Sequence, residues 1–245
     1  MRVRRLQLAF AVAVALWCVR VPLAAEAGEI IERIVVTVNN RPILQSDLDD
    51  EVRLEAFLDA RPLGSISDAD RSAALGRLID RALIDQQADE VNLRRATDQE
   101  VAQQVRQVRS QHPAGARDDT WQQALRSYGL EESDLAARVR SQLDELRFID
   151  QRFRPAVRIS LGEVQRYYRD QFLPELQKAG AEPRPLKEVQ PQIEEVLTQE
   201  RLTNMLSNWL QTLRGQASIN YRGVPPPPAA SAQSAPPLSR ADGAH

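Results

Sequence analysis

The sequence predicts a mainly α-helical protein with a small β-hairpin near its start and a long helix that closes the fold near its end. Two short apolar runs flank Asn39-Asn40, which is typical of a hairpin. Apolar residues then recur every three or four positions over most of 46–214, which is typical of amphipathic helices. About 190 residues outside the two ends are enough for one apolar core.

The hairpin is predicted from Ile34–Val38 and Ile43–Leu44, which are joined by Asn39-Asn40. Asparagine tolerates the positive φ angle that a tight hairpin turn requires. Pro42 has no N–H to donate to a ladder, so we expect the second strand at an edge of the sheet. A two-stranded hairpin is only marginally stable alone in water, so helices must cover it.

The first half of the helical region is divided by capping and breaking residues. We expect a first helix over 46–60, with Ser46 and Asp49 as a variant of the capping box. Ser67 is predicted to cap a second helix, and Thr97 with Glu100 forms a full capping box for a third. Thr120 is predicted to cap a short fourth helix.

The second half of the chain contains a fifth helix with an apolar stripe over 135–153 and a predicted strand at 157–160. Ser160 with Glu163 predicts a helix that continues through Phe172, and the prolines of 174–185 predict a loop. The last helix ends at Arg214 after roughly seven turns, and a short strand follows at 217–221. We expect this strand to join the hairpin in one small sheet, with the last helix packed on the N-terminal helices.

A family resemblance adds to this interpretation. The segments V-N-N-R-P-I (38–43) and S-D-L (46–48) resemble the start of SurA-type periplasmic chaperones. That family pairs a helical chaperone lobe with parvulin-type prolyl isomerase domains, and its C-terminal helix completes the N-terminal lobe. The resemblance covers roughly 34–221 and implies a chaperone domain at 28–221.

The resemblance implies no isomerase domain in this chain. Residues 159–185 stand where a parvulin domain is expected, and they are too few to form one. The chain has no glycine-rich G-G-D-L-G run, and neither His112 nor His245 lies in this segment. The catalytic residues of the family therefore have no counterparts here.

The two ends of the chain predict export and a tail. Residues 1–27 have a basic start, an uncharged apolar run at 6–19 and the A-x-A cleavage pattern at 25–27, which together predict a signal peptide and a periplasmic location. The alternative is an uncleaved anchor, but the apolar run is shorter than the ~20 residues of a membrane-spanning helix. Residues 222–245 are rich in proline and alanine, and we expect a disordered tail.

Composition excludes several classes of function. Cleavage after residue 27 leaves a net charge of about −5, which disfavours nucleic acid as a partner. The single cysteine, Cys18, lies in the signal peptide, so a disulfide is not expected. No glycine motif for ATP or a dinucleotide is present, and the two histidines lack metal-ligand spacing. We expect no cofactor, no metal and no catalytic residues.

Candidate client-binding residues are four aromatic residues: Phe57 on the first helix, and Tyr167, Tyr168 and Phe172 beside the proline-rich loop. A surface for unfolded polypeptides needs exposed apolar groups rimmed by charge. The alternative is that each of these residues belongs to the core. For Trp121, Phe148, Phe153 and Trp209, the long apolar stripes favour the core.

Three functions remain open at this point. The leading hypothesis is an ATP-independent periplasmic chaperone that binds unfolded exported or outer-membrane proteins. The first alternative is an interaction protein that docks one dedicated envelope partner, with the tail as a tether. The second is a peptidyl-prolyl cis-trans isomerase, because full-length relatives carry that activity.

Overall fold

The computed structural model describes residues 32–227. The predicted signal peptide (1–27) and the tail from 228 onward lie outside the described residues. The predicted fold class is confirmed: the protein is mainly helical, with a small three-stranded antiparallel sheet and a long helix near its C-terminus.

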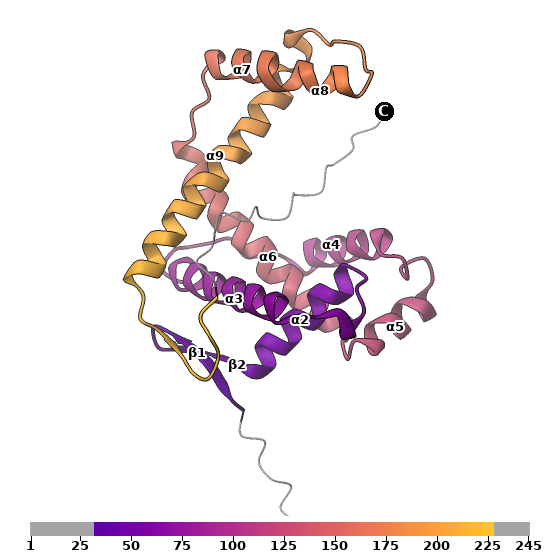
Figure 1. Cartoon of the computed structure of the whole chain (residues 1–245), viewed down its shortest axis with the longest axis vertical. Helices are drawn as coiled ribbons and strands as arrows, with labels where there is room; N and C mark the ends of the chain where they lie inside the picture. Colours follow the sequence, from indigo (N-terminus) through magenta and orange to yellow (C-terminus); the bar gives the residue numbers. More distant parts are fainter. Residues whose placement is uncertain (1–31, 228–245) are drawn as a thin grey trace, which may run out of the picture. The chain divides into compact units, whose positions relative to one another are not determined.

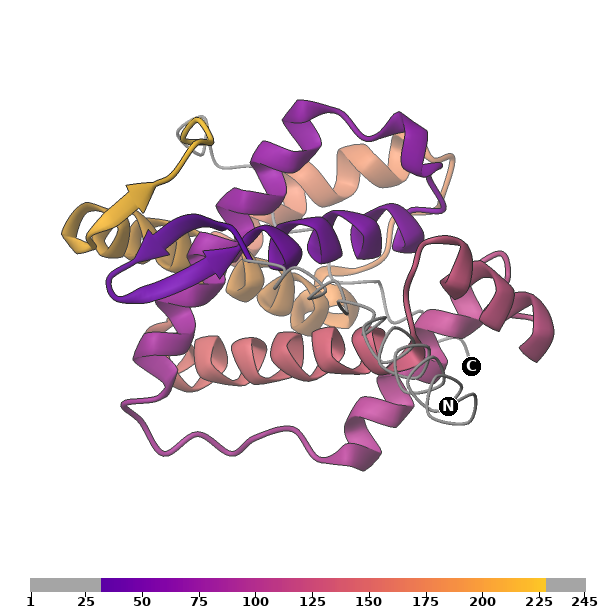
Figure 2. The same ribbon diagram turned by 90° about the horizontal axis from the view of Figure 1, so that it is seen from below.

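The sheet consists of β1 (Ile34–Val38), β2 (Arg41–Leu44) and β3 (Ile219–Tyr221), in the order β2-β1-β3. The predicted hairpin is confirmed, and Asn39 adopts the positive φ of 50° that its turn requires. β3 pairs antiparallel with β1, so the two ends of the described chain meet in one sheet, as predicted (Figure 2). Pro42 lies on β2, at an edge.

The helices are arranged along the chain in two groups, which are separated by the 3-10 turn η2 (Figure 1). The first group contains α2 (Gln45–Leu58), the 3-10 turn η1 (Leu63–Ser65), α3 (Asp68–Ala88), α4 (Asp98–Gln111), α5 (Asp118–Ser127) and α6 (Glu132–Phe153). The second group follows η2 (Arg154–Ala156) and contains α7 (Leu161–Tyr167), the π-helical turn η3 (Tyr168–Phe172), α8 (Leu173–Lys178) and α9 (Leu186–Gln216).

Three of the predicted caps are confirmed. The side chains of Ser67, Thr97 and Ser160 each accept a hydrogen bond from the backbone N–H three residues later, and the acidic side chain there binds back to the cap N–H. These reciprocal bonds satisfy donors that a helix leaves unpaired at its start. The same bonds lower the pKa of the acidic partners Asp70, Glu100 and Glu163, each to about 2.

The other two predicted caps are wrong. α2 begins at Gln45, and Asp47 rather than Asp49 accepts the 2.8 Å hydrogen bond from the Leu44 N–H. α5 begins before Thr120, whose hydroxyl instead donates to the carbonyl of Ala114 at 2.9 Å. In α2, Asp47 offers the same chemistry as Asp49 and is placed better, whereas α5 begins after Arg117, which makes no side-chain cap hydrogen bond.

The region 157–185 also differs from the prediction. Residues 157–160 form no strand; they follow a 3-10 turn that contains Pro155 and end at the cap Ser160. The predicted loop at 174–185 begins only after α8, because the helix passes through Pro174. Proline cannot donate to the carbonyl four residues earlier. The π-helical turn η3 directly precedes it, and there the Leu173 N–H bonds five residues back to Tyr168.

The core of the first helical group is divided into three clusters. Beneath the sheet, Val35, Val36 and Val38 pack on α2 and α3. A second cluster joins α2, α4, α5 and α6 around Phe57 and Trp121, and a third joins α3 and α6 to the second half of α9. We call the sheet, α2 to α6 and residues 202–216 of α9 the body.

A buried charge cluster links three helices of the body. Glu51 on α2 is only 5% exposed and accepts two hydrogen bonds from Arg81 on α3, at 3.1 and 2.9 Å. Arg138 on α6 lies 3.4 Å from the same carboxylate. Burial raises the pKa of Glu51, but the two arginines outweigh it and the net pKa is lowered. Burial dominates for Glu145 on α6, whose pKa is raised.

The start of the predicted tail contacts the body. The Arg222 N–H donates to the Val35 carbonyl at 2.8 Å, and Arg33 donates to the Gly223 carbonyl at 3.3 Å. Val224 is partly buried against the cluster beneath the sheet. Within 32–227, no helix is both long and apolar enough to span a bilayer.

Candidate polypeptide-binding surface

The second helical group has a small core of its own. We call residues 159–197 the arm; it contains α7, η3, α8 and the first turns of α9 (Figure 1). Its fully buried residues are Val164, Val189 and Ile193. The residues packed around them are only partly buried: Ile159, Tyr167, Tyr168, Phe172, Leu186 and Leu197. The arm therefore leaves part of its apolar surface accessible.

The arm is fixed at the start of α7. Glu163 caps the helix through Ser160, and its other carboxylate oxygen accepts a hydrogen bond from Arg201 on α9 at 2.6 Å. This contact joins the first turn of α7 to the part of α9 just beyond the arm. The aromatic residues follow on the next two turns of the same helix.

Two of the predicted aromatic residues lie together on the π-helical turn. The rings of Tyr168 and Phe172 stack with centroids 5.8 Å apart. The Tyr168 hydroxyl donates to the carbonyl of Arg184 at 2.7 Å, which ties the turn to the loop before α9. Both rings remain partly exposed, and exposed Arg169 and Asp170 lie between them in the sequence. The turn therefore carries a partly exposed aromatic pair together with two exposed charged residues.

Tyr167 belongs to the same cluster. Its side chain is partly buried against the arm core, and burial raises the pKa of its hydroxyl, with smaller contributions from Glu200 and Glu175. The structure thus brings together three of the four residues that the sequence suggested.

Phe57 lies elsewhere. It is 0% exposed and stacks on His112 with ring centroids 4.4 Å apart, with Trp121 and Tyr128 at its edges. A client cannot reach this ring without opening the body core, so Phe57 fits the alternative of a core residue. Trp121, Phe148 and Phe153 are buried, as expected, and Trp209 is partly buried.

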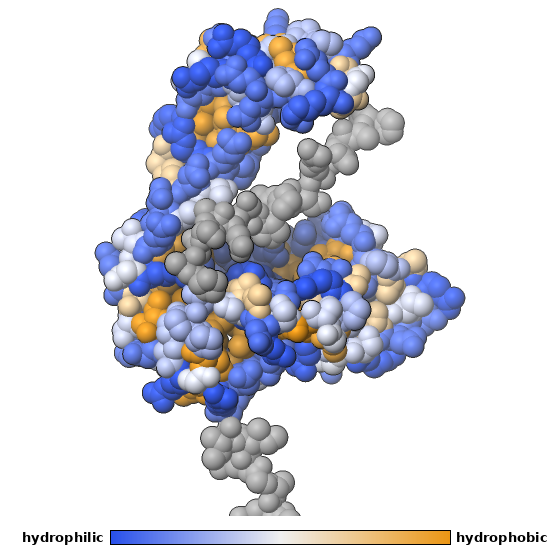
Figure 3. Space-filling view, viewed as in Figure 1, coloured by the Kyte–Doolittle hydropathy of each residue, from blue (hydrophilic) through white to orange (hydrophobic). Residues whose placement is uncertain are grey.

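Exposed aliphatic residues were missed by the sequence reasoning. Leu161 at the start of α7 is 56% exposed, and Val196 on α9 is 40% exposed. Figure 3 shows hydrophobic residues gathered where α7 meets α9, with hydrophilic residues around them. Val196 follows the apolar spacing of its helix, and periodicity alone does not distinguish such a position from a buried one. The exposure could have been expected from the lengths of the two helices. The long helix α9 has more apolar positions than the short helix α7 can cover.

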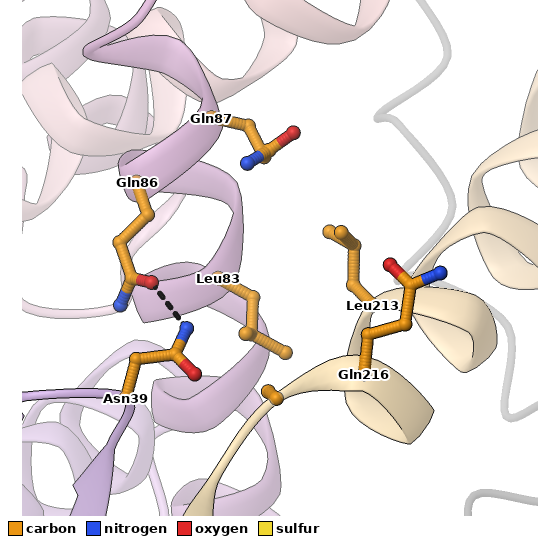
Figure 4. A pocket seen from close by; sticks show the side chains of 7 residues that line it. Asn39, Leu83, Gln86, Gln87, Leu213 and Gln216 are labelled. Carbon is orange, nitrogen blue, oxygen red and sulfur yellow. Dashed lines mark hydrogen bonds between the residues drawn. The ribbon is translucent and has the colours of Figure 1, made fainter.

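A small hollow lies at the other end of α9, between it and α3 (Figure 4). Two of its lining residues have structural roles: Asn39 donates to Gln86 at 2.6 Å and also accepts from the Ser218 N–H at 3.0 Å. These bonds fix the hairpin turn to α3 and to the chain after α9. Among residues 32–227, no three histidine, cysteine or acidic side chains form a group that could hold a metal ion.

Comparison with known families gives the decisive observation. Residues 3–147, more than half of the 245-residue chain, match the SurA-like N-terminal domain. The chain belongs to the SurA-like N-terminal domain family. The family match covers the hairpin and most of the body through α6, whereas the arm, α9 and β3 lie beyond it.

The same comparison found no parvulin domain. A search of curated proteins found no match. Membership of this family supports a chaperone-type role and polypeptide binding. The matched region is shorter at its C-terminal end than the resemblance drawn from the sequence, which extended to Tyr221.

Proposed function

We propose that this protein is an ATP-independent chaperone that holds unfolded exported polypeptides, outer-membrane proteins among them, in the periplasm. The observation that carries the proposal is the partly covered apolar surface of the arm, on a chain of the SurA-like N-terminal family. Tyr167, Tyr168 and Phe172 supply its aromatic part, and Leu161 and Val196 its aliphatic part.

The chemistry of this surface fits a weak and permissive binder. Partly exposed aromatic and aliphatic side chains gain free energy by being removed from water, and this gain does not depend on one client sequence. The exposed charged residues on the same turn, Arg169 and Asp170, keep the surface soluble when no client is bound. An unfolded client loses conformational entropy when it is held, so many such contacts are needed for stable binding.

The proposed location rests on the sequence of residues 1–27, which has the three parts of a secretory signal peptide. Cleavage after Ala27 releases a chain that starts at Gly28. Mass spectrometry of the protein isolated from the periplasmic fraction tests both the cleavage site and the location. A mass that includes residues 1–27 contradicts this part of the proposal.

The holding activity is tested by light scattering. An unfolded outer-membrane β-barrel protein is diluted from denaturant with increasing amounts of residues 28–245 and without ATP. We expect suppression of aggregation near one chaperone per client. If an equimolar amount has no effect, the holdase proposal is rejected and a dedicated partner becomes the function to examine.

A matched pair of variants locates the surface. Leu161→Ser with Val196→Ser removes exposed aliphatic groups from the arm, whereas Leu58→Ser with Leu63→Ser removes groups of similar exposure from the body. We expect the arm variant to lose most of the suppression and the body variant to keep it. Circular dichroism of both variants checks that the fold is retained. If the arm variant and the body variant lose the same share of the suppression, the exposed aliphatic groups of the arm are not the source of the holding activity.

A further inference from the structure

The sheet has two edges of different character. β2 forms one edge, where Pro42 lacks an N–H donor and Arg41 carries a charge that pairs with Asp89 at 2.7 Å. Proline and charged residues at an edge discourage pairing with another strand. β3 forms the other edge with the sequence Ile219-Asn220-Tyr221, which contains neither. The β3 edge therefore lacks proline and charge, and its length of three residues limits how much of a new strand it can pair.

The register of β3 shows which backbone groups face outward. Hydrogen bonds join the Asn39 N–H to the Ser218 carbonyl and the Arg222 N–H to the Val35 carbonyl, both at 2.8 Å. In an antiparallel pair, residues that bond to the partner strand alternate with residues that do not. Asn220, which lies midway between these two bonds, therefore has its N–H and carbonyl directed toward β1.

By the same alternation, the backbone groups of Ile219 and Tyr221 point away from β1. The hydrogen bonds found within 32–227 leave these outward groups without a partner. The side chains of both residues pack on the cluster beneath the sheet. β3 therefore presents two donors and two acceptors at a fixed spacing on a strand that is anchored to the core. Figure 2 shows this strand at one side of the sheet.

We propose that the outer edge of β3 binds an extended segment of an unfolded polypeptide as a fourth strand of the sheet. Backbone hydrogen bonds require no particular sequence, which suits a binder of many clients, and addition of a strand to a free edge is a known form of peptide recognition. The inference rests on the proposed function and adds a second mode of contact. The arm offers apolar side chains, and β3 offers hydrogen bonds to the main chain.

The register provides an unusually specific variant. Ile219→Pro removes an outward N–H and leaves the bonds between β3 and β1 in place, because that N–H does not face β1. Ile219→Ala is the matched control, since it shortens the same side chain and keeps the N–H. Asn220→Pro removes an inward N–H and shows the effect of breaking the sheet itself.

The probe is reduced, carboxymethylated α-lactalbumin, a permanently unfolded chain, and its affinity is measured by fluorescence anisotropy. We expect Ile219→Pro to weaken binding by about threefold to tenfold relative to Ile219→Ala, as the loss of a backbone hydrogen bond implies. Amide exchange measured by NMR should show the Ile219 and Tyr221 N–H groups becoming protected when the probe is added.

The outcomes separate this inference from the proposed function. The strand addition is overturned if both Ile219 variants bind the probe with equal affinity and the β3 amides gain no protection. The arm then remains as the binding surface. Failure of the wild-type protein to bind any unfolded chain overturns the proposed function itself. The inference is also overturned if, without probe, the protection of the β3 amides grows with protein concentration. In that case the edge binds a second copy of this chain.

Discussion

The body and the arm are built from the same kinds of residue but differ in how completely they bury them. The body encloses Phe57 and Trp121 fully and joins three helices through the buried Glu51. The arm encloses only three aliphatic residues and leaves its aromatic rings partly exposed. A segment with few buried contacts opens more easily than the core. The protein thus combines a stable support with a more easily opened surface.

The largest effect is expected from Phe57→Ala in the body. The ring is fully buried among His112, Trp121 and Tyr128, so its removal leaves a cavity and should lower the free energy of unfolding by about 3–5 kcal/mol. Urea denaturation followed by tryptophan fluorescence measures it. Leu58→Ala at the exposed neighbouring position should change stability by less than about 1 kcal/mol. If Phe57→Ala and Leu58→Ala lower the free energy of unfolding by the same amount, the stability of the body core does not depend on the Phe57 ring.

The matching change in the arm is Ile193→Ala, which removes a side chain that is 1% exposed. The lost contacts are worth about 2–5 kcal/mol within the arm core. If the arm opens separately, this loss should appear as faster amide exchange in α7 and α8, with little change in the urea midpoint of the body. A midpoint shift as large as that of Phe57→Ala would mean that arm and body unfold as one unit.

The hairpin, the three confirmed caps and the joining of the last strand to the first were predictable because each depends on local patterns or on chain order. The start of α2 was not, because Asp47 and Asp49 offer the same chemistry two positions apart. The site was predictable only in part. The aromatic residues at 167, 168 and 172 are close together in the sequence and could be predicted as one group. Nothing local to Phe57, however, reveals that helices α4 and α5 enclose it. Exposure depends on partners that are distant in sequence.

A smaller effect is expected from removing helix caps. Ser160→Ala in the arm and Thr97→Ala in the body each remove one side-chain cap, which costs about 1 kcal/mol. We expect Ser160→Ala to increase amide exchange only in α7, whereas Thr97→Ala should also lower the urea midpoint. The reverse pattern would contradict the separation of the two regions.

The smallest effect concerns Glu145 in the buried charge cluster. Burial raises its pKa above the ordinary 4.5 despite the attraction of Arg81 and Arg138. The charged form therefore destabilises the folded protein at pH values above the folded-state pKa, and this contribution disappears below pH 4.5. Glu145→Gln should raise the urea midpoint at neutral pH.

The gain from Glu145→Gln should vanish as the pH falls through the folded-state pKa toward 4.5, because the wild-type carboxyl then becomes neutral as well. Glu90→Gln, at an exposed position, is the matched control and should leave the midpoint unchanged at every pH. A loss of stability at neutral pH would mean that the carboxylate of Glu145 is needed by the two arginines.

The pairing of β3 with β1 has a consequence for how the chain matures during synthesis. Val38 lies opposite Ile219, so the sheet cannot be completed until almost the entire described chain has left the ribosome. Until then β1 has a free edge and the valines beneath it lack part of their cover. The newborn protein therefore spends most of its synthesis with an open strand edge and an incompletely covered apolar face, which are the features that chaperones recognise.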